Sequence, residues 1–221
     1  MRLFYSLLVA LCVLSSCSAK NSNVSHLRNT TYSKPSVALV PLINHTETEL
    51  PWDISKEITL GTREYLLKKN SLYLSTPDET DSDLIGVQDI NLLDDDLEMA
   101  NRFHPNDFVV LMELIKHEEL PYVRQAIKPV YPASGKIAYV LSMMIRIKVL
   151  DIRGDEPKVV LREIVRSNHL IPEALSQVHP EARPWGSVSY YHSPLGMSHR
   201  RLERDLAQRL ETYISSAQNR S

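Results

Sequence analysis

Histidine and carboxylate side chains are the groups in this 221-residue sequence that could do acid–base or metal chemistry. Three of the eight histidines, His179, His192 and His199, lie in one region. No two histidines have the i, i+4 spacing that places a pair of metal ligands on one helix face. His169 and His192 with Asp205 would form acid–base pairs, yet no serine can be named that they would activate. We therefore expect no catalytic residue and no metal site.

Glycines, acidic clusters and net charge predict no cofactor. The six glycines are too scattered for a phosphate loop, a dinucleotide fingerprint or a nucleophile elbow. Asp94, Asp95 and Asp96 offer oxygens to calcium, but three consecutive side chains point to different faces, which favours a solvated helix start. With 25 basic and 27 acidic residues, the chain has no basic face that would bind nucleic acid.

A segment rich in proline and aromatic residues, 172–194, is the strongest candidate for a binding surface. It carries Arg183, Trp185, Tyr190 and Tyr191. Aromatic and arginine side chains on a loop stiffened by proline are typical of interface hot spots. The same rings would also suit a loop that folds down over the sheet and buries them in the core. The sequence leaves both interpretations open.

The amino-terminal residues resemble an export signal. An uncharged apolar run, 3–14, follows Met1 and Arg2 and is too short to span a membrane. It ends in the motif Leu-Ser-Ser-Cys, Leu14 to Cys17, which resembles the lipobox of bacterial lipoproteins. The resemblance implies that residues 1–16 are a signal peptide and that Cys17 receives diacylglycerol and a further acyl chain such as palmitate. The alternative is an ordinary secretory signal cleaved after Ala19.

The resemblance also implies a location. Residues 17–35 would then be the lipidated cysteine and a flexible tether, because their many Ser, Thr and Asn residues offer no face to bury. Ser18 after the cysteine implies sorting to the outer membrane, with the domain facing the periplasm. We expect residues 36–221 to form a single domain.

Hydrophobic periodicity predicts alternating strands and helices in that domain. Expected strands are 37–43, 72–74, 108–115, 137–149 and 159–165, and expected helices are 52–69, 92–103 and one that begins after an N-cap at Ser193. The strand 137–149 alternates at period two, with Ser142, Arg146 and Lys148 on the polar face of a half-buried strand. Residues 78–83 are expected to form an acidic loop.

These elements predict a mixed α/β (α+β) fold, a sandwich of a mixed sheet with a long antiparallel hairpin and helices packed on it. The run 37–44, with Pro41, Leu42 and Asn44, is similar to the opening of envelope domains in the curli-export lipoprotein, the activator lipoproteins of penicillin-binding proteins and the amino-terminal domain of TolB. The chain also resembles small chlamydial lipoproteins of unknown function. None of these resemblances supplies a catalytic motif.

The leading hypothesis is a non-catalytic envelope lipoprotein, anchored in the membrane by its lipid, that binds a protein partner or supports assembly of an envelope complex. One alternative is an envelope hydrolase whose site joins distant residues, such as His192 with Asp or Glu. Another is a lipid- or glycan-binding module with an apolar cavity under the face of Ile145.

Overall fold

A computed structural model describes residues 34–84, 94–122, 137–173 and 183–219. Its six strands form one mixed sheet in the order β3-β1-β4-β5-β6, with β2 also pairing with β4. The strands are β1 (Ser36–Leu39), β2 (Ile43–Asn44), β3 (Tyr73–Leu74), β4 (Phe108–Pro121), β5 (Ile137–Asp151) and β6 (Lys158–Pro172). Strand β1 pairs in parallel with β3 and with β4, and β2 pairs in parallel with β4. The pairs β4–β5 and β5–β6 are antiparallel. The predicted fold class and the long hairpin are confirmed.

Five helices accompany the sheet in the described ranges: α2 (Ile54–Lys69), α3 (Pro77–Asp83), α4 (Asp96–Arg102), α6 (Val188–Tyr191) and α7 (Pro194–Gln218). Helix α7 begins as its sequence predicts. The Ser193 side chain accepts a hydrogen bond from the Gly196 amide, and Pro194 occupies the first helical turn. Helix α2 is capped by Asp53 and ends at Asn70, which adopts a left-handed conformation.

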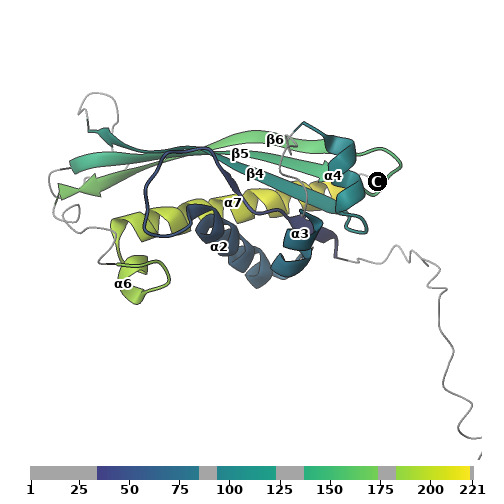
Figure 1. Ribbon diagram of the computed structural model, residues 1–221, viewed down its shortest axis with the longest axis horizontal. Coiled ribbons are helices and arrows are strands. Elements are labelled where there is room, and N and C mark those ends of the chain that lie inside the picture. Colours follow the sequence, from purple (N-terminus) through teal and green to yellow (C-terminus); the bar gives the residue numbers. More distant parts are fainter. Residues whose placement is uncertain (1–33, 85–93, 123–136, 174–182, 220–221) are drawn as a thin grey trace, which may run out of the picture. The chain divides into compact units, whose positions relative to one another are not determined.

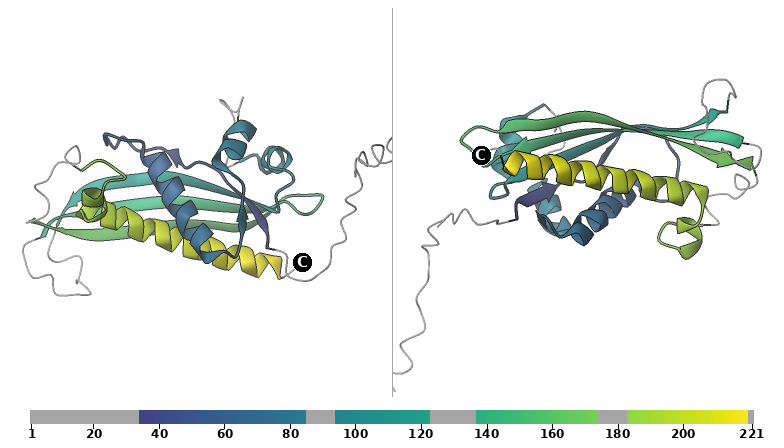
Figure 2. Two further views of the ribbon diagram at one scale, coloured as in Figure 1. Left: turned by 90° about the horizontal axis from the view of Figure 1, so that it is seen from below. Right: turned by 180° about the vertical axis from the view of Figure 1, so that it is seen from behind.

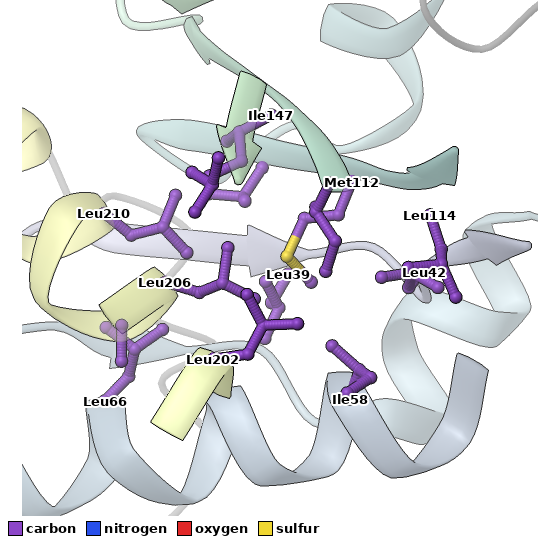
Figure 3. Packing of buried hydrophobic residues seen from close by; sticks show 14 of the residues in the cluster. Leu39, Leu42, Ile58, Leu66, Met112, Leu114, Ile147, Leu202, Leu206 and Leu210 are labelled. Carbon is purple, nitrogen blue, oxygen red and sulfur yellow. The ribbon is translucent and has the colours of Figure 1, made fainter. Parts of the chain in front are cut away.

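The main core lies between the sheet and the pair α2 and α7, which cover one face (Figures 1 and 2). Leu202, Leu206 and Leu210 repeat every four residues, so α7 presents one apolar stripe to the strands. Figure 3 shows these leucines beside Met112 and Ile147 of the sheet. A smaller cluster on the opposite face packs α4 against the sheet. The arrangement is a sandwich with unequal outer layers.

Helix α3 replaces the acidic loop that we expected at residues 78–83. Thr76 and Glu79 form a capping box, and Pro77 stands in the first turn, so local capping stabilises a short helix without an apolar stripe. The strands β4 and β6 extend beyond their predicted ends at residues 115 and 165. Their extra residues are largely polar, and pairing with the long β5 keeps them in the sheet.

The polar face of β5 is less exposed than its alternation predicts. Lys148 does lie opposite the core residues, but its side chain is only 1% exposed, because α4 covers it and Asp96 forms an ion pair with it. Ser142 is also buried, whereas Arg146 is exposed. The expected strand 37–43 is divided into β1 and β2, with Pro41 in the break. The helix expected over 92–103 begins, in the described part, at Asp96.

Candidate functional site

A tight corner between α6 and α7 turns one tyrosine of the aromatic segment inward. Ser187 caps α6 by accepting a hydrogen bond from the Tyr190 amide, and Ser193 caps α7 only a few residues later. Gly196 permits this turn, because a Cβ atom there would collide with the Tyr190 carbonyl group. Tyr190 is consequently 1% exposed and lies against α2 and α7.

Glu57 is the buried acceptor around which this region is built. Its Oε1 atom accepts a hydrogen bond from the Tyr190 hydroxyl and lies 2.9 Å from Nδ1 of His199. Its Oε2 atom accepts a hydrogen bond of 2.7 Å from the Trp52 indole. Glu57 and His199 are 2% and 0% exposed, so a buried carboxylate joins α2, α6 and α7. A charge at such depth is stable only when it is paired and hydrogen-bonded, as Glu57 is here.

His117 of β4 extends the cluster to the sheet. Its Nε2 atom lies 2.9 Å from Nε2 of His199, and its Nδ1 atom lies 3.2 Å from Oγ1 of Thr48. The Thr48 hydroxyl donates to the His117 carbonyl, so that same oxygen is left to accept from His117 Nδ1. His117 Nε2 must then accept from His199 Nε2. This hydrogen-bond pattern assigns protons to both nitrogens of His199, whose positive charge balances Glu57.

Burial and pairing separate the proton affinities of the cluster. Burial tends to raise the pKa of the Glu57 carboxyl, but the His199 charge and three hydrogen bonds more than offset it, and this pKa lies below its usual value. Burial, followed by the His199 charge, lowers the pKa of His117 to about 4. Burial and then the charge of Glu57 raise the pKa of Tyr190. The hydrogen-bond pattern and the lowered pKa of Glu57 agree on one ion pair in the cluster, Glu57 with His199.

Glu203 of α7 lies beside this ion pair. Burial and then the nearby charge of Glu57 raise the pKa of Glu203 to about 8, so at neutral pH its carboxyl group is mostly protonated. The carboxyl group packs over Gly61, where α2 and α7 approach so closely that a Cβ atom would collide with it. The contact between the two helices is therefore partly polar, with a protonated carboxyl group beside the Glu57–His199 ion pair.

The cluster, Glu57, His199, His117 and Tyr190, has the components of a proton relay but no exposed member. The hydrogen bonds of its two imidazoles go to Glu57, to Tyr190, to Thr48 and to each other. Three of the four residues are at most 2% exposed. Its evident effect is mechanical: it fixes α6 onto the body of the domain.

The other residues of the aromatic segment remain near the surface. The segment is therefore part core, as one interpretation of the sequence expected, and part accessible surface, as the other expected. Tyr190 is core, whereas Arg183, Trp185 and Tyr191 are partly exposed. The Arg200 guanidinium lies 5.0 Å from the centre of the Tyr191 ring, and the Tyr190 ring lies 5.5 Å from it. Two apolar side chains nearby in sequence, Val188 and Met197, are 75% and 50% exposed.

The histidine pairs that the sequence suggested are not formed. Asp205 pairs with Arg209, at 3.1 Å, and His169 lies 2.7 Å from the Ser167 hydroxyl. His192 is exposed at the end of α6. Within the ranges that the structure describes, no group of three or more His, Cys, Asp or Glu side chains is arranged to hold a metal ion. Cys17 and His179 lie outside the described residues.

Two further residues named in the sequence analysis, Asp95 and Ile145, can be placed in the structure. Asp95 accepts a hydrogen bond from the Glu98 amide and begins α4, which confirms the helix start predicted for the acidic triplet. Ile145 is fully buried in the main core, packed in the cluster that α7 covers. Among the described helices, none has the length and apolar character needed to cross a bilayer.

Sequence reasoning missed Glu57, Trp52 and His117. Glu57 carried a usable signal: it lies between Ile54 and Ile58 on the face that the predicted helix buries, where an acidic residue needs a partner. His117 carried none, because it lies beyond the end of the apolar run that predicted its strand. Its contact with His199 joins residues 82 positions apart in the sequence.

The chain belongs to DUF7499, a family of unknown function whose sequence model matches residues 25–218. No match is found among curated proteins. A hypothetical protein, CT253, from Chlamydia trachomatis has a similar solved structure, with a TM-score of 0.62 at 22% identity over 83% of this chain and 99% of that one. At this identity the likeness shows a shared fold.

Two lipoproteins are also among the solved structures that resemble the chain. Lipoprotein GNA1162 from Neisseria meningitidis matches with a TM-score of 0.44 at 12% identity, over 79% of this chain and 99% of that one. Rare lipoprotein B from Shewanella oneidensis matches with a TM-score of 0.36 at 14% identity, over 83% and 97% of the two chains.

Proposed function

We propose that this protein is a non-catalytic bacterial envelope lipoprotein, anchored through Cys17 in the outer membrane, whose periplasmic domain binds a protein partner. The binding surface is the exposed part of the aromatic segment: Arg183, Trp185 and Tyr191, with Val188 between them. These side chains lie on the outer side of the corner that precedes α7. We call it the α6 surface.

One observation supports the α6 surface above all: α6 is fixed from beneath while its outer side chains stay accessible. Tyr190 joins the short helix to Glu57 and His199 in the core. Val188, two residues before it, is 75% exposed. A surface whose backbone is already held loses little conformational entropy when a partner binds, and aromatic and arginine side chains are the usual anchors of such contacts.

The burial of the cluster favours binding over catalysis. A general base must come within hydrogen-bond reach of the proton that it removes from a substrate. The hydrogen-bonding atoms of Glu57 and His199 are already bonded to each other, to Tyr190 and to neighbouring side chains. Their position beneath α6 instead allows them to hold the α6 surface in place through Tyr190.

The α6 surface is tested by cross-linking in intact cells. A photoreactive amino acid at Val188 should capture a partner protein, and the same group at Tyr213, which is exposed on the far part of α7, should not. Replacing Trp185 and Tyr191 by Ala should reduce the capture several-fold while the thermal stability changes little. Equal capture from both positions, or a large loss of stability in the double variant, would contradict the proposal.

The anchor is tested separately by labelling with palmitate. The wild-type chain should incorporate label and partition into detergent, and the Cys17→Ala variant should do neither. Acyl chains gain about 0.8 kcal/mol for each buried methylene, so the difference in partitioning should be nearly complete. Equal labelling of the two chains would rule out lipidation at Cys17.

A further inference from the structure

The sheet has one long edge at β6. In the part of the chain that the structure describes, β6 ends the strand order and pairs with β5 alone. Figure 2 shows this strand at the rim of the sheet with α7 beneath it. Among the described residues, no strand pairs with the backbone N–H and C=O groups that point away from β5, and such groups can pair with another extended chain.

Between Leu161 and Leu170 the backbone of this edge is regular, and its charged side chains limit which strand can pair there. From Leu161 to Leu170 the register with β5 is continuous, and the register shifts lie outside this stretch. The stretch contains neither proline nor glycine, and Ile164 and Val165 favour extended backbone. Proteins usually protect a long edge with proline, a bulge, charged side chains or a covering element, and of these the stretch has only the charged side chains. An open, regular edge of ten residues is consequently a ready template for a strand.

Arginine side chains mark the outer face of the same stretch. Arg162 and Arg166 are exposed and flank Ile164, which is 40% exposed. These three residues oppose Lys148, Met144 and Arg146 of β5, so they lie on the face away from the main core. Among the described residues, no ion pair engages Arg162 or Arg166, whereas Arg146 is paired with Glu113 at 2.7 Å.

The inner side of the edge is also positively charged. Arg201 of α7 is exposed and close enough to β6 that its charge, after burial, contributes to lowering the pKa of His169 to about 4. His169 is thus neutral at physiological pH, and Arg201 has no ion pair among the residues described. Farther along α7, Arg209 is already paired with Glu163 and Asp205.

The charge pattern disfavours a second copy in the register that brings the two Ile164 side chains together. Two β6 edges paired about Ile164 with antiparallel symmetry would place Arg162 of each copy opposite Arg166 of the other. Like charges directly opposite each other destabilise a strand pair. A strand with acidic side chains at those two positions would instead form two favourable cross-strand pairs.

We infer that the β6 edge from Leu161 to Leu170 binds an extended segment of a partner protein in which two acidic side chains flank an apolar one at alternate positions. The acidic side chains face Arg162 and Arg166, about 13 Å apart at 3.3 Å per residue, and the apolar one packs on Ile164. Backbone hydrogen bonds provide most of the affinity, and the arginines select the segment. This edge is separate from the α6 surface and does not depend on it.

The inference is tested with a short Thr-rich peptide that contains Glu-Thr-Val-Thr-Glu. Its binding to the full chain in neutral detergent is measured by isothermal titration calorimetry. We expect binding, together with slower hydrogen exchange at amides of β6. Replacing both arginines, Arg162→Glu and Arg166→Glu, should weaken the binding by about tenfold or more, because attraction becomes repulsion. The matched control, Lys56→Glu with Lys68→Glu on α2, makes the same change in net charge and should leave the binding unchanged.

A peptide of reversed charge makes the result independent of any folding defect in the arginine variant. The peptide with Lys in place of each Glu should bind the Arg162→Glu, Arg166→Glu chain more tightly than it binds the wild-type chain. Three results would overturn the inference: equal binding of acidic and basic peptides to the wild type, protection of amides outside β6 only, or self-association through β6 that excludes the peptide. Binding of phosphatidylglycerol vesicles through these arginines, without binding of the peptide, would also overturn it.

Discussion

Replacing Glu57 tests whether the buried cluster holds the domain together. In Glu57→Ala the positively charged His199 loses its counterion, and the Tyr190 hydroxyl and Trp52 indole lose their acceptor. Removing one member of a buried ion pair typically costs about 3–5 kcal/mol of unfolding free energy. In Glu57→Gln the amide oxygen still serves two of the donors, but the NH₂ group faces the third, so we expect a loss of about 1–3 kcal/mol.

Urea unfolding followed by far-ultraviolet circular dichroism measures these losses near neutral pH. The midpoints should fall in the order wild type, Gln, Ala, with an unchanged slope. Glu64→Ala is the matched control, because Glu64 is an exposed acid on the same helix whose ion pair with Lys68 spans one turn. Such exposed pairs contribute less than about 1 kcal/mol.

The pH dependence gives the same prediction a second readout. The folded-state pKa of Glu57 lies below the ordinary glutamate value of 4.5, so the stability that Glu57 contributes is present above pH 4.5 and is lost as the pH falls through the folded-state pKa. The deficit of Glu57→Gln should therefore shrink in acid. A loss below about 1 kcal/mol in Glu57→Ala, within the range of surface substitutions, would refute the structural role that we assign to the cluster.

Two further predictions concern the neighbours of that ion pair. The pKa of Glu203 is raised to about 8, so its folded form retains a proton that the unfolded chain releases near pH 4.5, and wild-type stability falls as the pH rises between these values. Glu203→Gln should remove this dependence and be more stable, relative to wild type, at pH 8 than at pH 5 in thermal melts; a parallel shift at both pH values would contradict the assignment. Gly196→Ala should cost about 1–3 kcal/mol, since its Cβ would displace the Tyr190 carbonyl, and amide exchange should quicken first in α6; unchanged exchange there would show that the corner is not tight.

Periodicity and capping residues predicted those helices and strands whose own sequence contains a local pattern. The alternation along β5 and the Ser193-Pro194 start of α7 are local patterns, and the structure has both. Helix α3 was not predicted, because its stability comes from a capping box and not from an apolar stripe. The ends of β4 and β6 were set too early, because only pairing with β5 keeps polar residues extended there.

The candidate site was predicted less completely, for a physical reason. Tyr190 was identified, but its two possible environments differ only in what lies beneath it, and that is Glu57, 133 positions away. His199 meets Glu57 across 142 positions. A single sequence shows which residues need partners when buried but not which distant residues provide them. The accessible residues Arg183, Trp185 and Tyr191 remain predictions as contacts of a partner.

Helix α7 follows every strand in chain order, yet it covers the apolar face of the sheet along much of its length (Figure 2). Until α7 docks, α2 alone covers the leucines and isoleucines of β4 and β5 on that side, and the hairpin by itself is only marginally stable. The domain should therefore fold in one late step, once α7 is available, and not strand by strand along the chain.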